Sequence, residues 1–415
     1  MKKFNHNSQM KLKGDILILT FWSYKDALVQ TYTLPYVNII RNIIDKQRKI
    51  FIVTFEQEKF EFKEDERAVI EDNLRKQNIY LVSFSYKPFG VKKMIAAVSD
   101  LISMIRLIRK EKISIIHAFG PNAGGYGFLL SKITGHDLII DSYEPHAECM
   151  MESGEWSRYG PAYNILLKFE KLETRHASFL IGTTAAMKDY AKSKYKITPQ
   201  NFLVKPACID FTHFYPRAKD EGLVRELGLE NKIVCVYAGK LGGTYLKDEV
   251  FDFVESCYFY WQQDFRFLML TSEDKDEVKK MVQKHNIPES IVITKYVEHK
   301  EIPKYLSVGD FGINPQVPVP SKRYGTPIKN GEYWGMGLPV IISPKISDDS
   351  DVIEKNDIGV VMNFTQKDLY NGAIKKIDSL LKTNQRNELQ KKIFNIAQSQ
   401  RSFSIAYDVY NKIYD

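Results

Sequence analysis

The stretch KIVCVYAGKLGGTYLKDEVFDFV, residues 232–254, has the pattern of a strand, a turn and a helix. It begins with an apolar run, passes through a turn that contains Gly239, Gly242 and Gly243, and continues as an amphipathic helix. The apolar run is continuous rather than alternating, which is typical of a parallel strand covered on both faces. This strand–turn–helix unit therefore predicts an α/β domain.

The same order of strand and helix continues through most of the chain. Further strand-like runs are DILILTF, KIFIVTF, IYLVSFS, ISIIHAF, DLIIDSY and FLIGTT in the first half, and RFLMLTS, IVITKYV, FGINP, PVIIS and IGVVMN in the second. Segments of helical period separate them, most clearly at 91–110. This alternation predicts βαβ units and doubly wound parallel sheets.

The chain has 415 residues, which suits two domains of about 200 residues each. One alternation spans 15 to about 184 and a second begins near 232, with a proline-containing connection between them. We therefore predict Rossmann-like domains at 1–205 and 212–398, with a C-terminal helix at about 399–415 that packs back on the first. Two such parallel sheets would face a central cleft at their carboxyl ends, where ligands bind.

Composition narrows the range of partners. The net charge of +8 suits an anionic ligand, an anionic membrane surface or nucleic acid. Nucleic acid is the weakest of these, because zinc-finger spacing, RNA-recognition sequences and dense arginine tracts are missing from the sequence. The basic N-terminus lacks the apolar core of a secretory signal, and the four cysteines are scattered, with Cys235 in an apolar run. These features favour a reducing cytoplasm.

The glycine turn is a candidate anion site. Glycines let backbone approach a ligand closely, and the start of the following helix offers unpaired N–H groups. Lys240 and Lys247 add positive charge to the same turn. An ordinary βα turn with solvated lysines remains the alternative.

The stretch TPIKNGEYWGMGLPVIIS, residues 326–343, reads as a short helix followed by a buried strand. Pro327 opens the helix, and Lys329 lies in its first turn, where the helix dipole disfavours a cation unless an anion is close. Glu332 follows on the same face and suits the vicinal hydroxyls of a ribose. A phosphate with a ribose beside it would explain both groups. The alternative is a Lys329–Glu332 pair on a solvated face, worth about 0.2–0.5 kcal/mol.

The run SKRYGTPIKNGEYWGMGLPVIIS resembles the C-terminal signature of the retaining glycosyltransferases of family 4, the glycosyl transferases group 1, which have the GT-B fold. That signature is a Ser/Thr-Pro-x-Lys, a Glu-Tyr helix and a Gly-x-Pro-Val strand. YAGKLGG with LKDE is similar to the phosphate loop of the same family, and IIHAFGPNAGGYGFLLSKITGHDLIIDSYEPHAE extends the resemblance into the first half.

The resemblance implies roles for particular residues. Glu332 would hold the donor ribose, Lys240 and Lys247 would contact its diphosphate, and the turn 325–331 would offer backbone amides. His146 falls near the donor sugar, although it also fits a satisfied polar residue at a strand end. The implied catalytic residues are His146, Lys240, Lys247 and Glu332, and the implied binding residues are Gly239, Gly242, Gly243, Tyr296, Val297, Thr326, Pro327, Ile328, Lys329, Asn330, Gly331 and Glu332.

The resemblance implies a hexosyltransferase that moves a sugar, with retention, from a nucleotide-diphosphate sugar of UDP or GDP type to a glycan or lipid-linked glycan in bacterial surface polysaccharide synthesis. It implies no separate cofactor and no metal site, and we interpret the acidic SDDSD at 347–351 as a helix start with Asp or Ser caps. Two features depart from the family: Tyr324 stands where a first glutamate is common, and FWSYKDALVQTY replaces a Gly-Gly loop. A nucleotide-sugar epimerase and a non-catalytic nucleotide-binding scaffold remain alternatives.

The helix at 91–110 is basic on its polar side, through Lys92, Lys93, Arg106, Arg109 and Lys110. It could rest on anionic lipid at the inner face of the cell membrane, as a peripheral contact. A solvated basic face on a cytoplasmic protein is the interpretation that we favour from sequence.

Overall fold

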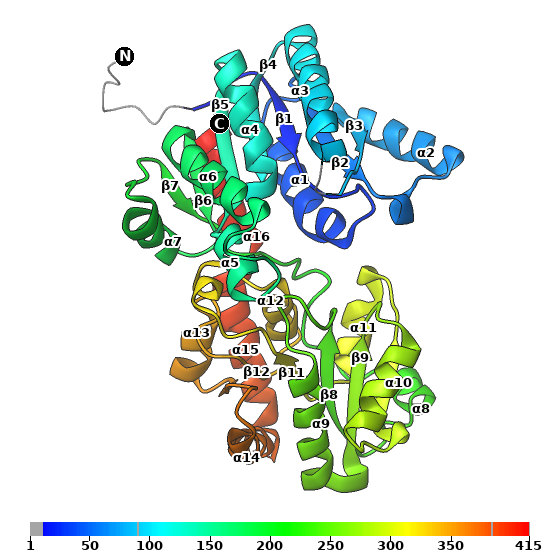
Figure 1. The fold of residues 1–415 in the computed structure, drawn as a ribbon. Helices are drawn as coiled ribbons and strands as arrows, with labels where there is room; N and C mark the ends of the chain where they lie inside the picture. The colour runs from blue at the N-terminus through cyan, green and yellow to red at the C-terminus, as the bar shows by residue number, and fades with distance from the viewer. Residues whose placement is uncertain (1–10, 89–90, 383–384, 415) are drawn as a thin grey trace. The chain divides into compact units, whose positions relative to one another are not determined.

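The computed structural model describes residues 11–88, 91–382 and 385–414. The chain forms two compact units, each built around its own sheet (Figure 1). The N-terminal unit comprises Met1–Glu148, Arg158–Lys205 and Ser404–Asp415, and the C-terminal unit comprises Cys149–Ser157 and Pro206–Phe403. The predicted boundaries, 1–205 and 212–398, place residues 149–157 in the first domain, whereas in the structure they pack with the C-terminal unit.

The N-terminal unit contains a seven-stranded parallel sheet in the order β3-β2-β1-β4-β5-β6-β7. Its strands are β1 (Asp15–Leu19), β2 (Ile50–Glu56), β3 (Ile79–Ser85), β4 (Ile113–Phe119), β5 (Asp137–Tyr143), β6 (Phe179–Gly182) and β7 (Phe202–Val204). Its helices are α1 (Leu34–Ile43), α2 (Glu64–Arg75), α3 (Val91–Glu111), α4 (Pro121–Thr134), α5 (His146–Glu152, which continues into the C-terminal unit), α6 (Pro161–His176), α7 (Ala186–Tyr190) and α16 (Phe403–Tyr414).

The C-terminal unit contains a six-stranded parallel sheet in the order β10-β9-β8-β11-β12-β13. Its strands are β8 (Ile233–Ala238), β9 (Phe265–Leu270), β10 (Val292–Lys295), β11 (Phe311–Asn314), β12 (Val340–Ile342) and β13 (Gly359–Val361). Its helices are α8 (Glu221–Glu226), α9 (Asp248–Trp261), α10 (Lys275–Lys284), α11 (Ile302–Ser307), α12 (Ile328–Gly335), α13 (Asp349–Asn356), α14 (Tyr370–Lys382) and α15 (Arg386–Arg401).

Both strand orders confirm the predicted doubly wound α/β fold. In each sheet the order reverses beside the first strand, between β1 and β4 and between β8 and β11. Such switch points are where open parallel sheets bind ligands, outside the carboxyl ends of the strands. In the C-terminal unit this position lies where β8 enters the glycine turn, so the fold indicates a ligand site at that turn.

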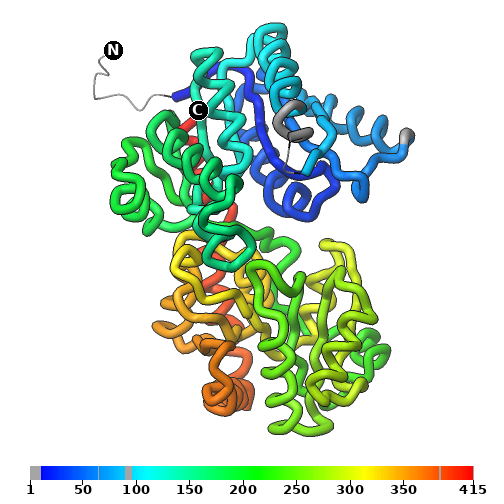
Figure 2. The backbone as a smooth tube through the Cα atoms, viewed as in Figure 1, coloured from blue at the N-terminus to red at the C-terminus, as the bar shows by residue number. Residues whose placement is uncertain are grey.

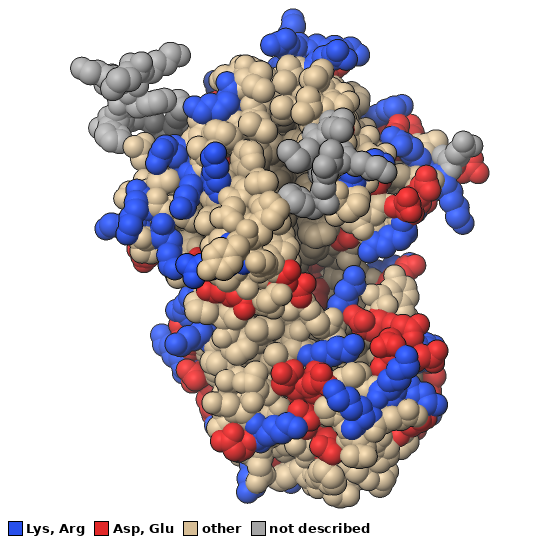
Figure 3. Space-filling model, in the orientation of Figure 1, with Lys and Arg blue, Asp and Glu red and all other residues tan. Residues whose placement is uncertain are grey.

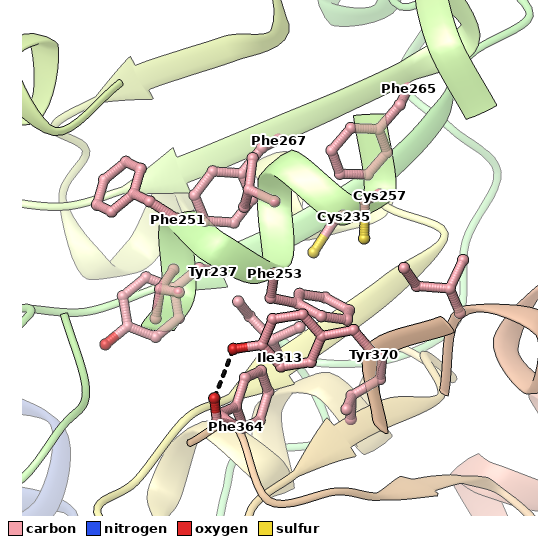
Figure 4. Packing of buried hydrophobic residues seen from close by; sticks show 14 of the residues in the cluster. Cys235, Tyr237, Phe251, Phe253, Cys257, Phe265, Phe267, Ile313, Phe364 and Tyr370 are labelled. Atoms are coloured by element: carbon pink, nitrogen blue, oxygen red, sulfur yellow. Dashed lines mark hydrogen bonds between the residues drawn. The ribbon is translucent and has the colours of Figure 1, made fainter. Parts of the chain in front are cut away.

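A large apolar cluster lies on one face of the C-terminal sheet, under α9 and α14. Cys235 and Cys257 are buried there as free thiols (Figure 4). The hydroxyl of Tyr370 donates to the carbonyl of Phe364 at 2.5 Å, which satisfies the one polar atom that this ring carries into the core. The drawn members of the cluster include Tyr237, Phe251, Phe253, Phe265, Phe267 and Ile313.

The last helix, α16, packs within the N-terminal unit, and Figure 2 shows the red end of the chain among its elements. Asp141, on β5, is fully buried and accepts a hydrogen bond of 2.6 Å from the hydroxyl of Tyr410 on α16. The amine of Lys205 lies 3.2 Å from the same carboxylate. Burial alone would raise the pKa of Asp141, but Lys205 and the hydrogen bonds lower it to about 2. This charged cluster therefore fixes α16 on the sheet.

Candidate functional site

The turn after β8 and the start of α12 meet at one point of the C-terminal unit. Gly239 has φ +145°, and a Cβ at this position would lie 2.7 Å from the amine nitrogen of Lys329. The backbone angle therefore favours glycine, and a side chain here would displace the Lys329 amine. Gly242 and Gly243, with φ of +77° and +63°, carry the turn onward through the left-handed region. The structure thus brings together the three predicted glycines and Lys329.

The surroundings of Lys329 are aromatic. Its Nζ lies 3.9 Å from the ring centroid of Tyr245, 4.5 Å from that of Tyr237 and 3.5 Å from the Tyr237 hydroxyl. Burial lowers the pKa of Lys329 to about 7, with Glu332 raising it and Lys322 lowering it. Among the described residues, no carboxylate lies within 4.0 Å of this amine, so the pairing of Lys329 with Glu332 on a solvated face is wrong.

Glu332 pairs instead with His299, a residue that sequence reasoning missed. The buried Glu332 carboxylate lies 2.8 Å, through Oε1, from Nε2 of His299. The ring of Phe214 packs on the imidazole, with centroids 5.7 Å apart. His299 comes from the turn before α11, 33 positions away in sequence, so no local pattern indicates the contact. A ligand hydroxyl at Glu332 would therefore meet the carboxylate beside an imidazole.

The two lysines of the glycine turn differ in their surroundings. Lys240 is exposed, and its carbonyl accepts a hydrogen bond of 2.5 Å from the Tyr237 hydroxyl. Lys247 is half-buried and stands at the N-cap of α9. The turn is tied to the loop after β11 because Leu246 N donates to Pro315 O at 2.9 Å and Val317 N donates to Thr244 O at 3.1 Å. Both lysines therefore lie at the carboxyl edge of the sheet.

A chain of buried polar groups fixes α12. Asn314 Nδ2 donates to Asn330 Oδ1 at 2.9 Å, and Asn330 Nδ2 donates to Asp349 Oδ2 at 2.7 Å. Asp349 forms a buried ion pair with Arg401, near the end of α15. Burial raises the pKa of Asp349, and Arg401 and Asn330 oppose this shift. The side-chain oxygen and nitrogen of Asn330 are thus both hydrogen-bonded inside the unit. Gly331 packs against Ile209 and Arg401.

The other predicted binding residues divide between core and surface. Pro327 is the N-cap of α12, and the Thr326 hydroxyl lies 3.3 Å from that of Ser347. Ile328 packs against a second hydrophobic cluster of the C-terminal unit, which includes Tyr333 and Trp334. Val297 also packs against this cluster, whereas Tyr296 is 74% exposed. Tyr296 is therefore accessible to a planar ligand, and Val297 offers chiefly its backbone.

The acidic stretch at 347–351 begins α13, as predicted, but its side chains act differently. Asp348 stands at the N-cap, and in the described structure its side chain makes no cap hydrogen bond. Asp349 faces inward, and Ser350 Oγ accepts from Ile346 N at 2.9 Å. An Asp therefore stands at the N-cap as expected, but its side chain does not cap the helix. Within the described ranges, no group of three or more His, Cys, Asp or Glu side chains is arranged to hold a metal ion.

The segment 149–157 brings two carboxylates to the same loops. Glu152 Oε2 accepts a hydrogen bond of 2.9 Å from Ser321 N, at the start of the short helix η7 (Pro320–Tyr324). Glu155 Oε1 would lie 3.9 Å from a Cβ placed on Gly243. Sequence reasoning missed both, because it assigned this segment to the first domain.

His146 is the one predicted catalytic residue that lies in the N-terminal unit. It starts α5, with Nδ1 3.5 Å from Oε1 of Glu144. The next residue, Ala147, donates its backbone N–H to Glu170 at 2.8 Å. Burial raises the pKa of Glu170 to about 7, and the Ala147 N–H and the Tyr195 hydroxyl oppose this shift.

Two doubly wound units in tandem, with a glycine turn and a Lys/Glu helix at the carboxyl edge of the second sheet, are the architecture of the GT-B fold. Residues 232–383 match the family model described as Glycosyl transferases group 1. The match covers most of the C-terminal unit, which therefore carries a glycosyl transferases group 1 domain. The search of curated proteins found no significant match.

Solved structures support the fold over nearly the whole chain. HepE of Anabaena, in complex with UDP-glucose, is 15% identical with a TM-score of 0.68, covering 95% of this chain and 98% of that one. WaaG, a glycosyltransferase involved in lipopolysaccharide biosynthesis, is 14% identical with a TM-score of 0.70, covering 96% and 99%. Sucrose-phosphate synthase from Thermosynechococcus elongatus is 13% identical with a TM-score of 0.71, covering 95% and 97%.

We expect Arg401→Met to destabilise the C-terminal unit by about 3–5 kcal/mol, because Asp349 would stay buried without its cation. Adding Asp349→Asn should recover part of the loss, since the amide carries no charge. Urea unfolding followed by tryptophan fluorescence measures both variants, because Trp156, Trp261 and Trp334 belong to this unit. A single variant as stable as wild type, or a double variant weaker than the single one, would contradict the assignment.

Proposed function

We propose that this protein moves a sugar, with retention at the anomeric carbon, from a nucleotide-diphosphate sugar to a hydroxyl of a glycan acceptor. The observation that carries this proposal is Lys329, a half-buried cation beside the glycine turn with, in the described part of the chain, no carboxylate in ion-pair reach. Such a group is suited to an anionic ligand. Glu332, one helical turn on, suits the ribose hydroxyls of the same ligand.

The chemistry requires stabilisation of the departing diphosphate. Negative charge develops on its oxygens as the glycosidic bond breaks, and fixed positive groups lower the barrier most when they are already in place. Lys240, Lys247 and Lys329 supply charge at the carboxyl edge of the sheet, and backbone N–H groups of the glycine turn and of α12 supply dipoles. The family resemblance supports same-face attack, in which the departing phosphate takes the proton of the acceptor hydroxyl.

The similar structures guide the choice of substrates. HepE was solved with UDP-glucose, which favours UDP over GDP as the nucleotide. WaaG acts in lipopolysaccharide biosynthesis, which supports a bacterial surface glycan or a lipid-linked glycan as the acceptor. We therefore rank UDP-hexoses first among donors and place the role in surface polysaccharide synthesis.

We also propose that α3 contacts anionic lipid. Val98 and Ile102, one helical turn apart, are 59% and 44% exposed, and Arg106 and Arg109 extend the same helix as exposed cations. Figure 3 shows blue side chains gathered over the end of α3 at the top of the view. The side chains of Lys92 and Lys93 lie outside the described residues. Exposed apolar groups next to arginines favour an interfacial helix over a merely solvated one.

Within the described ranges, the chain contains no helix long and apolar enough to cross a bilayer. A lipid contact through α3 would therefore be peripheral, at the inner face of the cell membrane.

Glu332→Ala should lower kcat/KM for the donor by about ten- to hundredfold, because a charged hydrogen-bond acceptor is lost. Release of nucleoside diphosphate from UDP-, GDP-, ADP- and dTDP-sugars measures this, with Glu298→Ala, an exposed glutamate paired with Lys300, as the matched control. Proton NMR of the product then reads its anomeric configuration. Inversion would contradict a retaining route.

The same assay separates the alternatives. A changed sugar nucleotide that is formed without acceptor would indicate an epimerase. Nucleotide binding without turnover across donors and acceptors would indicate a scaffold. Activity of Glu332→Ala equal to that of wild type would move the donor site away from α12.

For the lipid contact, we expect the protein to float with vesicles of phosphatidylcholine and phosphatidylglycerol at low salt but not with phosphatidylcholine alone. The double variant Val98→Ser/Ile102→Ser should lose binding, whereas Val69→Ser, which changes an equally exposed valine on α2, should keep it. Anionic lipid attracts each nearby arginine by about 1 kcal/mol, so binding should also weaken with salt. Wild-type protein that stays at the bottom of the gradient at low salt would contradict the proposed lipid contact.

A further inference from the structure

Aromatic rings, rather than a carboxylate, contact the amine of Lys329. A carboxylate would hold a lysine firmly, but it would also cancel most of the field that the lysine offers to an incoming anion. The face of an aromatic ring attracts a cation through its quadrupole and leaves the net charge in place. Rings can therefore orient a buried amine without neutralising it.

The geometry around Lys329 fits such a cage. Its Nζ lies 3.9 Å from the centroid of the Tyr245 ring and 4.5 Å from that of Tyr237, both within the 6 Å over which a ring attracts a cation. Gly239 leaves the space that the amine occupies between the turn and the helix, since a Cβ there would approach it to 2.7 Å. The position of the amine is thus set by β8, by the glycine turn and by α12.

The two tyrosines differ in burial and in their hydrogen bonds. Tyr237 is fully buried in the core of the sheet, and its hydroxyl is committed to the carbonyl of Lys240. Tyr245 is half-buried in the glycine turn, where its N–H donates to Gly242 O at 3.0 Å and its backbone bridges to Gln316. Its ring makes the closer approach to Lys329 and lies outside the core. Tyr245 is therefore the member of the cage that can be altered without removing core packing.

We propose that Tyr245, backed by Tyr237, is a positioning residue that holds the Lys329 amine charged and aimed at the donor diphosphate. The inference rests on the proposed function and deepens it, because it assigns a role to a residue of the glycine turn that touches Lys329. The ring acts through the lysine and makes no step of the reaction itself.

The charges that face Lys329 set the expected pH dependence. Glu332, on the same helix and bound by His299, favours the charged amine, whereas burial and Lys322 on η7 disfavour it. Burial also raises the pKa of the Tyr237 hydroxyl, which therefore stays neutral. A bound diphosphate favours the charged form, so donor affinity should fall as pH rises through neutrality and the amine loses its proton. Without the Tyr245 ring, the proton is held less tightly and the fall should begin at lower pH.

The test compares Tyr245→Leu with Tyr245→Phe, and with Phe259→Leu as a control that removes an exposed ring from α9 of the same unit. Tyr245→Leu should raise KM for the donor by about three- to thirtyfold with a smaller effect on kcat, because a cation–π contact is lost. The alkaline limb of kcat/KM should move to lower pH in this variant. Tyr245→Phe keeps the ring and should keep the KM and the pH profile of wild type.

A Tyr245→Leu variant with the wild-type KM and pH profile would overturn the cage. If this variant does not fold, Tyr245→Met takes its place, because its flexible side chain fills similar space without a ring face. Competitive amine labelling across pH 6–10, read by mass spectrometry, gives the labelling midpoint of Lys329 in the wild-type and variant chains. The midpoint should move to lower pH when the ring is removed, because the proton is then held less tightly, and an unchanged midpoint would overturn the proposal. Because labelling needs no nucleotide, its outcome is separate from any failure of the chain to bind a donor.

Discussion

The ion pair between Asp349 and Arg401 holds α12, the helix that carries Lys329 and Glu332, through the side chain of Asn330. Both side chains are buried, and the carboxylate also takes the amide of Asn330, which in turn accepts from Asn314. This chain joins the ends of β11, α12, α13 and α15. Since α12 carries Lys329 and Glu332, the ion pair fixes the direction in which both point. Tyr333 adds a second tie, because its hydroxyl accepts the backbone N–H of Ala238 at the end of β8 at 2.8 Å.

The two charged side chains of α12 have different partners. Lys329 contacts aromatic rings rather than a carboxylate, whereas Glu332 is matched by His299. One part of the helix therefore remains attractive to an anion, and the next turn offers hydrogen-bond acceptors beside an imidazole. A nucleoside diphosphate presents these two demands in the same order, a diphosphate followed by a ribose.

Much of the fold could be predicted from the sequence because buried parallel strands and amphipathic helices have different periods. The apolar runs correspond to β1–β6 and β8–β13, and the glycine turn falls where β8 ends. Strand β7 was not predicted, since its three residues lie in the connection and form no long apolar run. Lys329, Glu332 and the glycines could be predicted as neighbours because a short helix and a βα turn share the carboxyl edge of the sheet. His299, Arg401 and Glu152 could not, because each joins the site through a contact between distant segments.

We propose that Lys329 and Glu332 receive the diphosphate and the ribose of a nucleotide donor. A crystal structure of the protein with UDP tests this assignment most directly. We expect a phosphate oxygen within hydrogen-bond distance of Lys329 Nζ and a ribose hydroxyl on the Glu332 carboxylate, with Tyr245 still packed on the amine. A nucleotide bound elsewhere in the C-terminal unit, with Lys329 and Glu332 unchanged, would contradict it.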